Sequence, residues 1–132
     1  MNRKEFDAES YTVFLKEKST EDFKVAELML RWQSMGYCLF WTHAALQKSF
    51  AAIICKETQK RPPWRGDLTK LARLAKVSLT SEQREFFKVL NFYHKEGLYL
   101  GLVYPEPSRK ETRKHLLTAK KMAASLSNPL AE

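Results

Sequence analysis

The chain has 132 residues, a formal net charge of +8 and only four glycines. That length suits a single domain, and the scarcity of glycine argues against a turn-rich β fold. The basic balance favours acidic partners such as nucleic acid, nucleotides or an acidic protein, and does not choose among them.

The N-terminal third predicts two helical segments. The opening residues, MNRKEFDAES, are charged, so we expect no secretory signal. A helical signal covers residues 2–18, with Asn2 as its candidate N-cap, and the cluster Lys16–Ser19 indicates a break. From Asp22 to Met35 the apolar residues follow a 3.6-residue period, which predicts an amphipathic helix. Gly36 indicates a short turn into an antiparallel neighbour.

Residues 37–55 form a stretch that is apolar on nearly every side. A helix of this kind must be buried on all sides, so we expect the other elements to pack around it. Polar residues at its middle argue against a membrane span. Among them, Gln47 and Lys48 are expected nearer the surface than Phe50, Ala51 and Ile54, and His43 is expected to be a hydrogen-bonded core or interface residue.

Both cysteines, Cys38 and Cys55, fall on this one predicted helix. At 1.5 Å per residue they lie about 25 Å apart, which is too far for a disulfide. We therefore expect free, buried thiols and a cytoplasmic location.

The second half begins with a proline-bearing loop, KETQKRPPWRG, and Asp67 is the expected N-cap of a short helix. Thr80 with Gln83 predicts a capping box that opens the next helix, and Gly97 and Gly101 indicate a kink or turn. A second capping box, Ser108 with Glu111, opens a last helix that runs to about residue 126. The C-terminal residues are expected to fray.

These elements predict an all-α fold: an antiparallel up-and-down bundle of four main helices, with a short extra helix and an N-terminal helical segment. We expect one domain, with residues 1–19 as an N-terminal extension, 20–126 as the bundle core and 127–132 as a frayed tail.

Three short motifs occur in the order of a known family. Residues 43–54, HAALQKSFAAII, have the shape of a core helix QQAxEKxxKAxx, with Lys48 at the first lysine, Gln47 in place of glutamate and Ala51 in place of the second lysine. Residues 65–68, RGDL, correspond to a His-Asp-Leu helix start with glycine in the place of histidine. Residues 103–105, VYP, correspond to an Arg-Tyr-Pro step without the arginine. Over roughly residues 20–126, the chain resembles the HEPN family.

That resemblance implies a helical bundle that is usually a homodimer. Some members are partners of small nucleotidyltransferase-like proteins in toxin–antitoxin pairs, and others are proposed to bind nucleotides. A catalytically active branch consists of metal-independent ribonucleases with an Arg-x(4–6)-His motif.

Arg109 and His115 have the spacing of that motif. In such a ribonuclease, histidine moves the proton of the 2′-hydroxyl group and arginine stabilises the phosphate charge. Two features argue against a catalytic role for this pair. Residues six apart on a regular helix point about 120° apart, and a segment so rich in basic residues easily produces an Arg-x5-His spacing by chance.

The excess positive charge lies in two blocks. One covers the end of the central helix, the proline loop and the short helix, and the other covers the last helix. If the blocks converge in space, they would attract phosphate groups; otherwise they form a solvated surface. The candidate phosphate-binding residues are Lys48, Arg61, Arg65, Arg109, Arg113 and Lys114. Trp64 either stacks on a base or, as we favour, pins the loop to the bundle.

No metal-ligand spacing and no glycine-rich phosphate loop occurs, so we expect neither a metal nor a cofactor. The interpretation we favour is a non-enzymatic domain that binds a nucleotide or nucleic acid, possibly as the partner of a nucleotidyltransferase-like protein. The alternatives are a ribonuclease that uses Arg109 and His115, and a structural scaffold. We also expect a homodimer and no membrane association.

Overall fold

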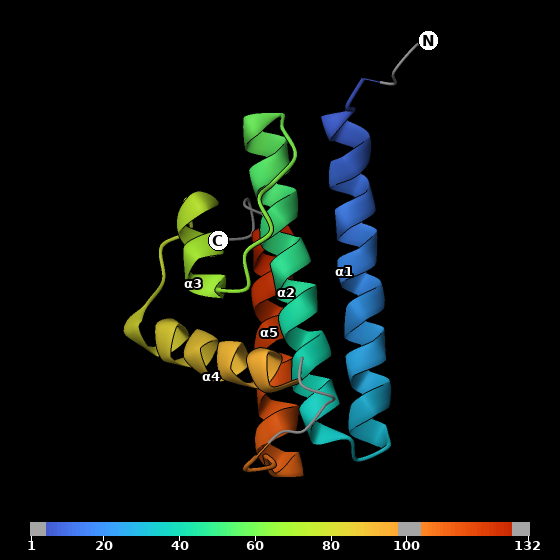
Figure 1. The fold of residues 1–132 in the computed structure, drawn as a ribbon, viewed down its shortest axis with the longest axis vertical. Coiled ribbons are helices and arrows are strands. Elements are labelled where there is room, and N and C mark those ends of the chain that lie inside the picture. Colours follow the sequence, from blue (N-terminus) through green and yellow to red (C-terminus); the bar gives the residue numbers. More distant parts are fainter. Residues whose placement is uncertain (1–4, 98–103, 128–132) are drawn as a thin grey trace.

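The computed structural model describes residues 5–97 and 104–127 of the chain. Its helices are α1 (Ala8–Arg31), α2 (Met35–Thr58), α3 (Leu68–Leu74), α4 (Ser81–Gly97) and α5 (Arg109–Ser127). In Figure 1, α1 and α2 run side by side, α5 lies behind α2, and α4 crosses them at a steep angle. The described ranges contain no strand. The all-α class, the four main helices and the short extra helix are therefore confirmed.

α1 is one continuous helix, so the predicted break at Lys16–Ser19 is wrong, and the N-terminal segment is not separate from the helix that follows it. The buried positions continue with a helical period through the polar cluster, and Ser19 itself is buried. Its hydroxyl donates to the carbonyl oxygen of Ala45 on α2 at 2.8 Å. The N-cap is Asp7, whose carboxylate accepts from the amide of Ser10 at 3.1 Å. Asn2 lies outside the described residues.

α2 is the central helix, as expected, because it packs against each of the other four helices. Phe50, Ala51 and Ile54 are buried, whereas Gln47 and Lys48 are partly exposed, which confirms the predicted orientation of this helix. The rings of Phe50 and Phe87 meet edge to face in the core, with centroids 5.7 Å apart. Both cysteines are buried and free, as predicted.

The predicted caps of the second half are present. The carboxylate of Asp67 accepts from the amide of Thr69 at 2.9 Å and begins α3. Thr80 and Gln83 form a reciprocal capping box before α4: each side chain accepts from the other residue's amide, at 3.1 and 2.9 Å. At the start of α5, Ser108 Oγ accepts from the amide of Glu111 at 3.1 Å. The predicted kink at Gly97–Gly101 and the frayed C-terminus fall largely outside the described residues.

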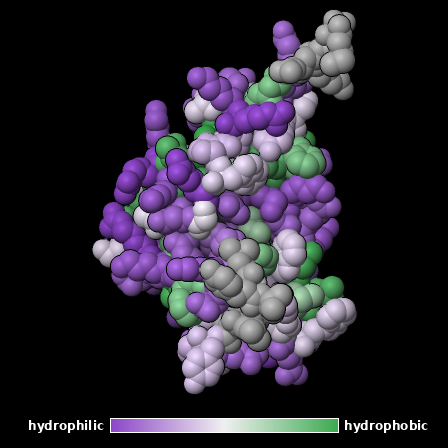
Figure 2. Space-filling view, viewed as in Figure 1, coloured by the Kyte–Doolittle hydropathy of each residue, from purple (hydrophilic) through white to green (hydrophobic). Residues whose placement is uncertain are grey.

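The surface in Figure 2 is mainly hydrophilic, and its hydrophobic residues form small, separate patches. In the described ranges, every helix is too short or too polar to cross a lipid bilayer. The hydrophobic residues instead form a core around α2, to which α4 contributes Phe86, Phe87 and Leu90. The outer faces of the described helices carry mainly polar and basic side chains, together with a few exposed aromatic ones such as Trp32 and Tyr37.

Candidate nucleic-acid interface

His43 anchors the proline loop from inside the bundle. Its ring is fully buried, and Nε2–H donates to the carbonyl oxygen of Gly66 at 2.7 Å and to Oδ1 of Asn91 at 3.2 Å. Both partners are acceptors, which places the proton on Nε2 and leaves Nδ1, which is buried, without a partner. The Nδ2 group of Asn91 donates to Asp67 at 3.0 Å, so the network extends to the cap of α3. The expected hydrogen-bonded core histidine is thereby confirmed.

The ring of His43 also stacks on the ring of His94, with centroids 3.8 Å apart, and His94 stacks in turn on Phe40 at 5.1 Å. Burial, helped by the neighbouring His94, lowers the pKa of His43 to about 3. Burial also lowers the pKa of His94. Both rings are therefore neutral at pH 7, and this pair is a structural element rather than a source of positive charge for phosphate.

The loop before α3 has polar anchors in α2. Nε2 of Gln47 donates to the carbonyl oxygen of Arg65 at 2.8 Å, next to the bond that His43 makes to Gly66. The side chain of Trp64 is 54% exposed. Gln47 and His43, rather than Trp64 as we favoured, thus supply the polar contacts that hold the loop, and the indole ring is left accessible.

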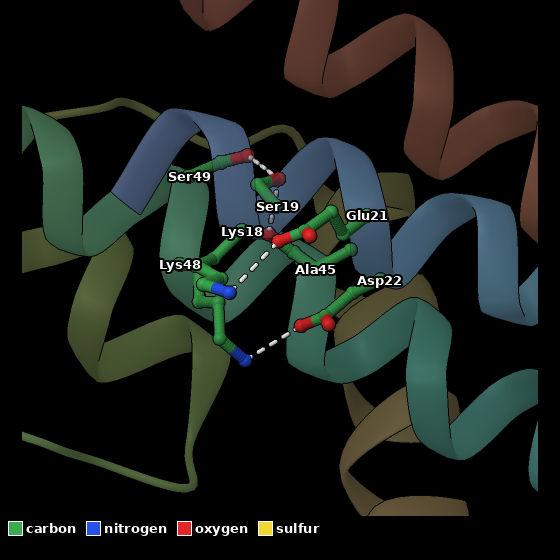
Figure 3. A network of polar contacts seen from close by, with 7 residues as sticks. All are labelled: Lys18, Ser19, Glu21, Asp22, Ala45, Lys48 and Ser49. Carbon is green, nitrogen blue, oxygen red and sulfur yellow. Dashed lines mark hydrogen bonds and ion pairs between the residues drawn. The ribbon is translucent and has the colours of Figure 1, made fainter. Parts of the chain in front are cut away.

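Two of the predicted phosphate-binding cations already have partners within the chain. Nζ of Lys48 donates to Asp22 on α1 at 2.6 Å (Figure 3). The two side chains are 25% and 10% exposed. The guanidinium of Arg61 lies 4.7 Å from the ring centroid of Phe6 and 5.5 Å from that of Tyr11. The Lys48–Asp22 pair joins α2 to α1, and Arg61 packs the loop against aromatic rings near the start of α1. Arg61 and Arg65 are both exposed.

The structure brings together the three predicted cations of α5. Arg109, Arg113 and Lys114 line a shallow groove of about 530 Å³, which we call the α5 groove. All three are exposed, and none forms an ion pair with a described carboxylate. The other residues that line the α5 groove are Lys110, Leu117, Thr118 and Lys121.

The candidate catalytic pair does not converge within the chain. His115 is half-buried and stacks on Phe86, with centroids 5.5 Å apart, and burial lowers its pKa. Arg109 lines the α5 groove, and His115 does not. Because α5 is a regular helix, the two side chains project about 120° apart.

A larger groove of about 790 Å³ lies next to the α5 groove and shares Thr118 and Lys121 with it. We call it the lysine groove, because Lys16, Lys56 and Lys76 line it together with Lys121. Lys56 and Lys76 belong to the first basic block and Lys121 to the second, so the two blocks meet here. Sequence reasoning missed Lys16, which fell in the wrongly predicted helix break, and no local pattern places it beside the others.

The family comparison agrees with this architecture. The model of the HEPN domain family matches residues 12–128. The chain belongs to the HEPN domain family. The match begins within α1 and ends just after α5, so it includes both grooves of this HEPN domain. Neither the curated proteins nor the solved structures include a significant match to the chain. In the described residues, no group of histidine, cysteine or acidic side chains is placed to hold a metal ion.

Proposed function

We propose that this HEPN domain binds single-stranded nucleic acid, and does not cleave it, through phosphate contacts made by Arg109, Arg113 and Lys114 in the α5 groove. The observation that carries this proposal is the meeting of the two basic blocks at Lys121, where the α5 groove joins the lysine groove. Membership in the HEPN family supports a nucleotide- or RNA-related function in general terms.

The physical basis is the release of counterions. Each phosphate that a lysine or arginine neutralises frees a condensed cation, so affinity falls steeply as salt is added. Unpaired, exposed cations suit this role because they have no internal carboxylate to give up on binding. Arg113 and Lys114 meet this condition, whereas Lys48 does not, because Asp22 already neutralises it. The α5 groove therefore replaces Lys48 as the centre of the proposed site, and Arg61, which packs on the rings of Phe6 and Tyr11, lines neither groove.

The loop with Trp64 and Arg65 belongs to a different surface. In Figure 1 the chain between α2 and α3 passes in front of α2, whereas α5 lies behind it. Neither residue lines the α5 groove or the lysine groove. We therefore place the bound strand on α5 and give Trp64 no part in holding it.

The test is a titration of labelled single-stranded RNA at several salt concentrations, followed by fluorescence anisotropy. The double variant Arg113→Gln/Lys114→Gln should bind at least about tenfold more weakly, with the slope of log K against log salt reduced by about 1.4. Its matched control is Lys70→Gln/Arg73→Gln, which removes the same charge from exposed residues of α3 that line neither groove. Equal weakening in both variants, or no binding by the wild type, would contradict the proposal.

The same samples test the ribonuclease alternative. Run on a denaturing gel without divalent metal, the RNA should remain intact. Shortened RNA that is lost in both Arg109→Ala and His115→Ala would instead identify the domain as an active nuclease. Because Arg109 and His115 lie apart within one chain, such cleavage would require a second copy of the chain to complete the catalytic site.

We further propose that the chain forms a homodimer through the surface near the α1–α2 turn. There Trp32 and Tyr37 are 67% and 42% exposed, and exposed tryptophan and tyrosine side chains are enriched at subunit interfaces. Light scattering coupled to size exclusion should give twice the chain mass, and Trp32→Ser should lower it. A monomeric wild type would refute this part without affecting the α5 groove. A nucleotidyltransferase-like partner, which the resemblance implies, is a separate prediction.

A further inference from the structure

The lysine groove continues into a second hollow. A groove of about 420 Å³ lies between α1 and α5 and shares Lys16, Ile53 and Leu126 with it, and we call it the α1–α5 groove. Its lining on α1 extends from Lys16 to Glu27. At 1.5 Å per residue this is about 17 Å, or about three turns of a helix. The two grooves together form one continuous track across the bundle, which we call the docking track.

The floor of the docking track is aliphatic. Five side chains line it that are partly buried against the core: Ile53, Val77, Leu79, Met122 and Leu126. Of the described residues that line the two grooves, only Phe23 is aromatic, and its ring is buried. Nucleic-acid bases stack on accessible aromatic rings, which this floor does not offer. The floor suits the aliphatic side chains of a protein segment instead.

The polar groups beside the floor already have partners within the chain. The hydroxyl group of Ser19 donates to the carbonyl oxygen of Ala45, and the hydroxyl groups of Ser19 and Ser49 lie 2.8 Å apart (Figure 3). Both serines line the α1–α5 groove. They are short as well as satisfied, so they permit close approach by another helix and demand no polar ligand.

The rim of the docking track carries unpaired positive charge. Its cations come from four parts of the fold: Lys16 and Lys24 of α1, Lys56 of α2, Lys76 of the α3–α4 connection and Lys121 of α5. All five are exposed, and none forms an ion pair with a described carboxylate. Of the two acids in the lining, Glu27 is paired with Lys120, which leaves Glu57 alone. Carboxylates from a partner would relieve the mutual repulsion of these lysines.

We propose that the docking track binds an acidic amphipathic helix of a partner protein. Aliphatic side chains at helical spacing would pack on Ile53, Met122 and Leu126, and aspartates or glutamates beside them would face the lysines of the rim. A nucleic-acid strand supplies the negative charge but no aliphatic side chains for the floor. The inference goes beyond the proposed function and does not rest on it. The two sites meet at Lys121, so a docked helix and a bound strand would compete for that side chain.

The probe is a fluorescein-labelled synthetic peptide of about 14 residues, with leucines at i, i+3, i+4 and i+7 and glutamates at most other positions. Its control has the same composition in scrambled order, which keeps the charge and removes the apolar face. In anisotropy titrations the wild-type protein should bind the amphipathic peptide, and the scrambled peptide at least about tenfold more weakly. Equal binding of the two peptides would reduce the interaction to charge attraction and overturn the inference.

Protein variants then locate the binding site. The rim variant Lys56→Gln/Lys76→Gln and the floor variant Met122→Ser/Leu126→Ser should each weaken the amphipathic peptide at least about tenfold, whereas Lys70→Gln/Arg73→Gln should not. Far-ultraviolet circular dichroism checks that each variant folds. Leu126→Ser alone, in the last turn of α5, is a milder floor variant should the double one unfold. Unchanged peptide affinity in the rim and floor variants would overturn the inference.

The floor variant also separates the rival occupants. Its RNA affinity should stay within about twofold of the wild type, because phosphate contacts depend on charge. RNA binding weakened as much as peptide binding would give the docking track to the strand, and loss of a dimer by the floor variant would give it to a second copy of the chain. Either result would overturn the inference. Wild-type protein that binds the amphipathic peptide but no RNA would refute the proposed function alone.

Discussion

The imidazole rings of His43 and His94 stack with their centroids 3.8 Å apart, and the ring of His43 is fully buried. Its Nε2–H is shared between Gly66 and Asn91, and Nδ1 has no acceptor within reach. A second proton would therefore enter a site that gives it no hydrogen-bond partner and faces another imidazole. The contact between α2, α4 and the proline loop depends on both rings staying neutral.

We predict that the domain loses stability as the pH falls below about 6.5, the ordinary pKa of histidine. Burial lowers the pKa of His43 to about 3, so between these values the unfolded chain takes up a proton that the folded chain refuses. Stability is thus complete above pH 6.5 and declines toward pH 3, by at most about 1.4 kcal/mol per pH unit for this histidine. Urea unfolding at pH 7.5, 6 and 5 measures the decline.

The variant His43→Gln provides the control for this prediction. Glutamine keeps an N–H donor for Gly66 and has no group that titrates in this range. The His43→Gln variant should be less stable at pH 7.5, and its stability should decline less on acidification. Some decline should remain, because the pKa values of His94 and His115 are also lowered. An unchanged pH dependence in His43→Gln would show that His43 does not control it.

A second prediction concerns the ion pair between Lys48 and Asp22. Both side chains are largely buried between α1 and α2, so removal of one partner leaves the other with an uncompensated charge. Asp22→Asn and Lys48→Met should each lower the free energy of unfolding by about 1–2 kcal/mol, and the double variant by less than the sum. Lys18 and Glu21 form the matched exposed pair, and their coupling should stay below about 0.5 kcal/mol. Equal coupling in the two pairs would refute this explanation.

A third prediction distinguishes two glycines of the same region. A Cβ atom at Gly97 would lie 2.8 Å from Cδ2 of Phe40, whose ring is stacked on His94. Gly97→Ala should therefore cost about 1–3 kcal/mol, although alanine favours helix. At Gly66 the nearest atom, on His94, would be 4.0 Å away, so Gly66→Ala should change stability by less than about 0.5 kcal/mol. Thermal unfolding of both variants decides, and a stabilised Gly97→Ala would contradict the packing described.

A fourth prediction concerns Trp64. Because Trp64 is 54% exposed and side chains of α2 hold the loop through its backbone carbonyls, Trp64→Ala should change the free energy of unfolding by less than about 0.5 kcal/mol. RNA affinity should also be unchanged, because Trp64 lines neither groove. A marked loss of RNA affinity with normal stability would restore the base-stacking role that the sequence offered.

Much of the fold was predictable because its signals are local. Asp67 and the pair Thr80–Gln83 cap their helices as predicted, and the apolar residues of α2 placed it at the centre. The prediction of a break at Lys16–Ser19 was wrong because a serine counts as a polar residue in a hydrophobic pattern, even where the fold buries it. In the fold, Ser19 is small enough to pack against α2 and donates to Ala45.

The candidate site was less predictable, because it depends on which distant residues meet. Nothing near Lys48 in the sequence shows that Asp22 neutralises it, and nothing near Lys16 places it beside Lys121. The basic residues of α5 could be grouped from the sequence because they share one helix, and they line one groove. Convergence of charge from four elements is a property of the tertiary packing alone.

The most direct test of the central claim is nuclear magnetic resonance of the labelled protein during titration with single-stranded RNA. The account predicts the largest shift changes at backbone amides of residues 109–121, with further changes at residues 76–79 that line the lysine groove. Residues 61–65 should change little. The largest changes at Trp64 and Arg65, with α5 unaffected, would contradict the account and move the site to the proline loop. No change at all would refute nucleic-acid binding by this domain.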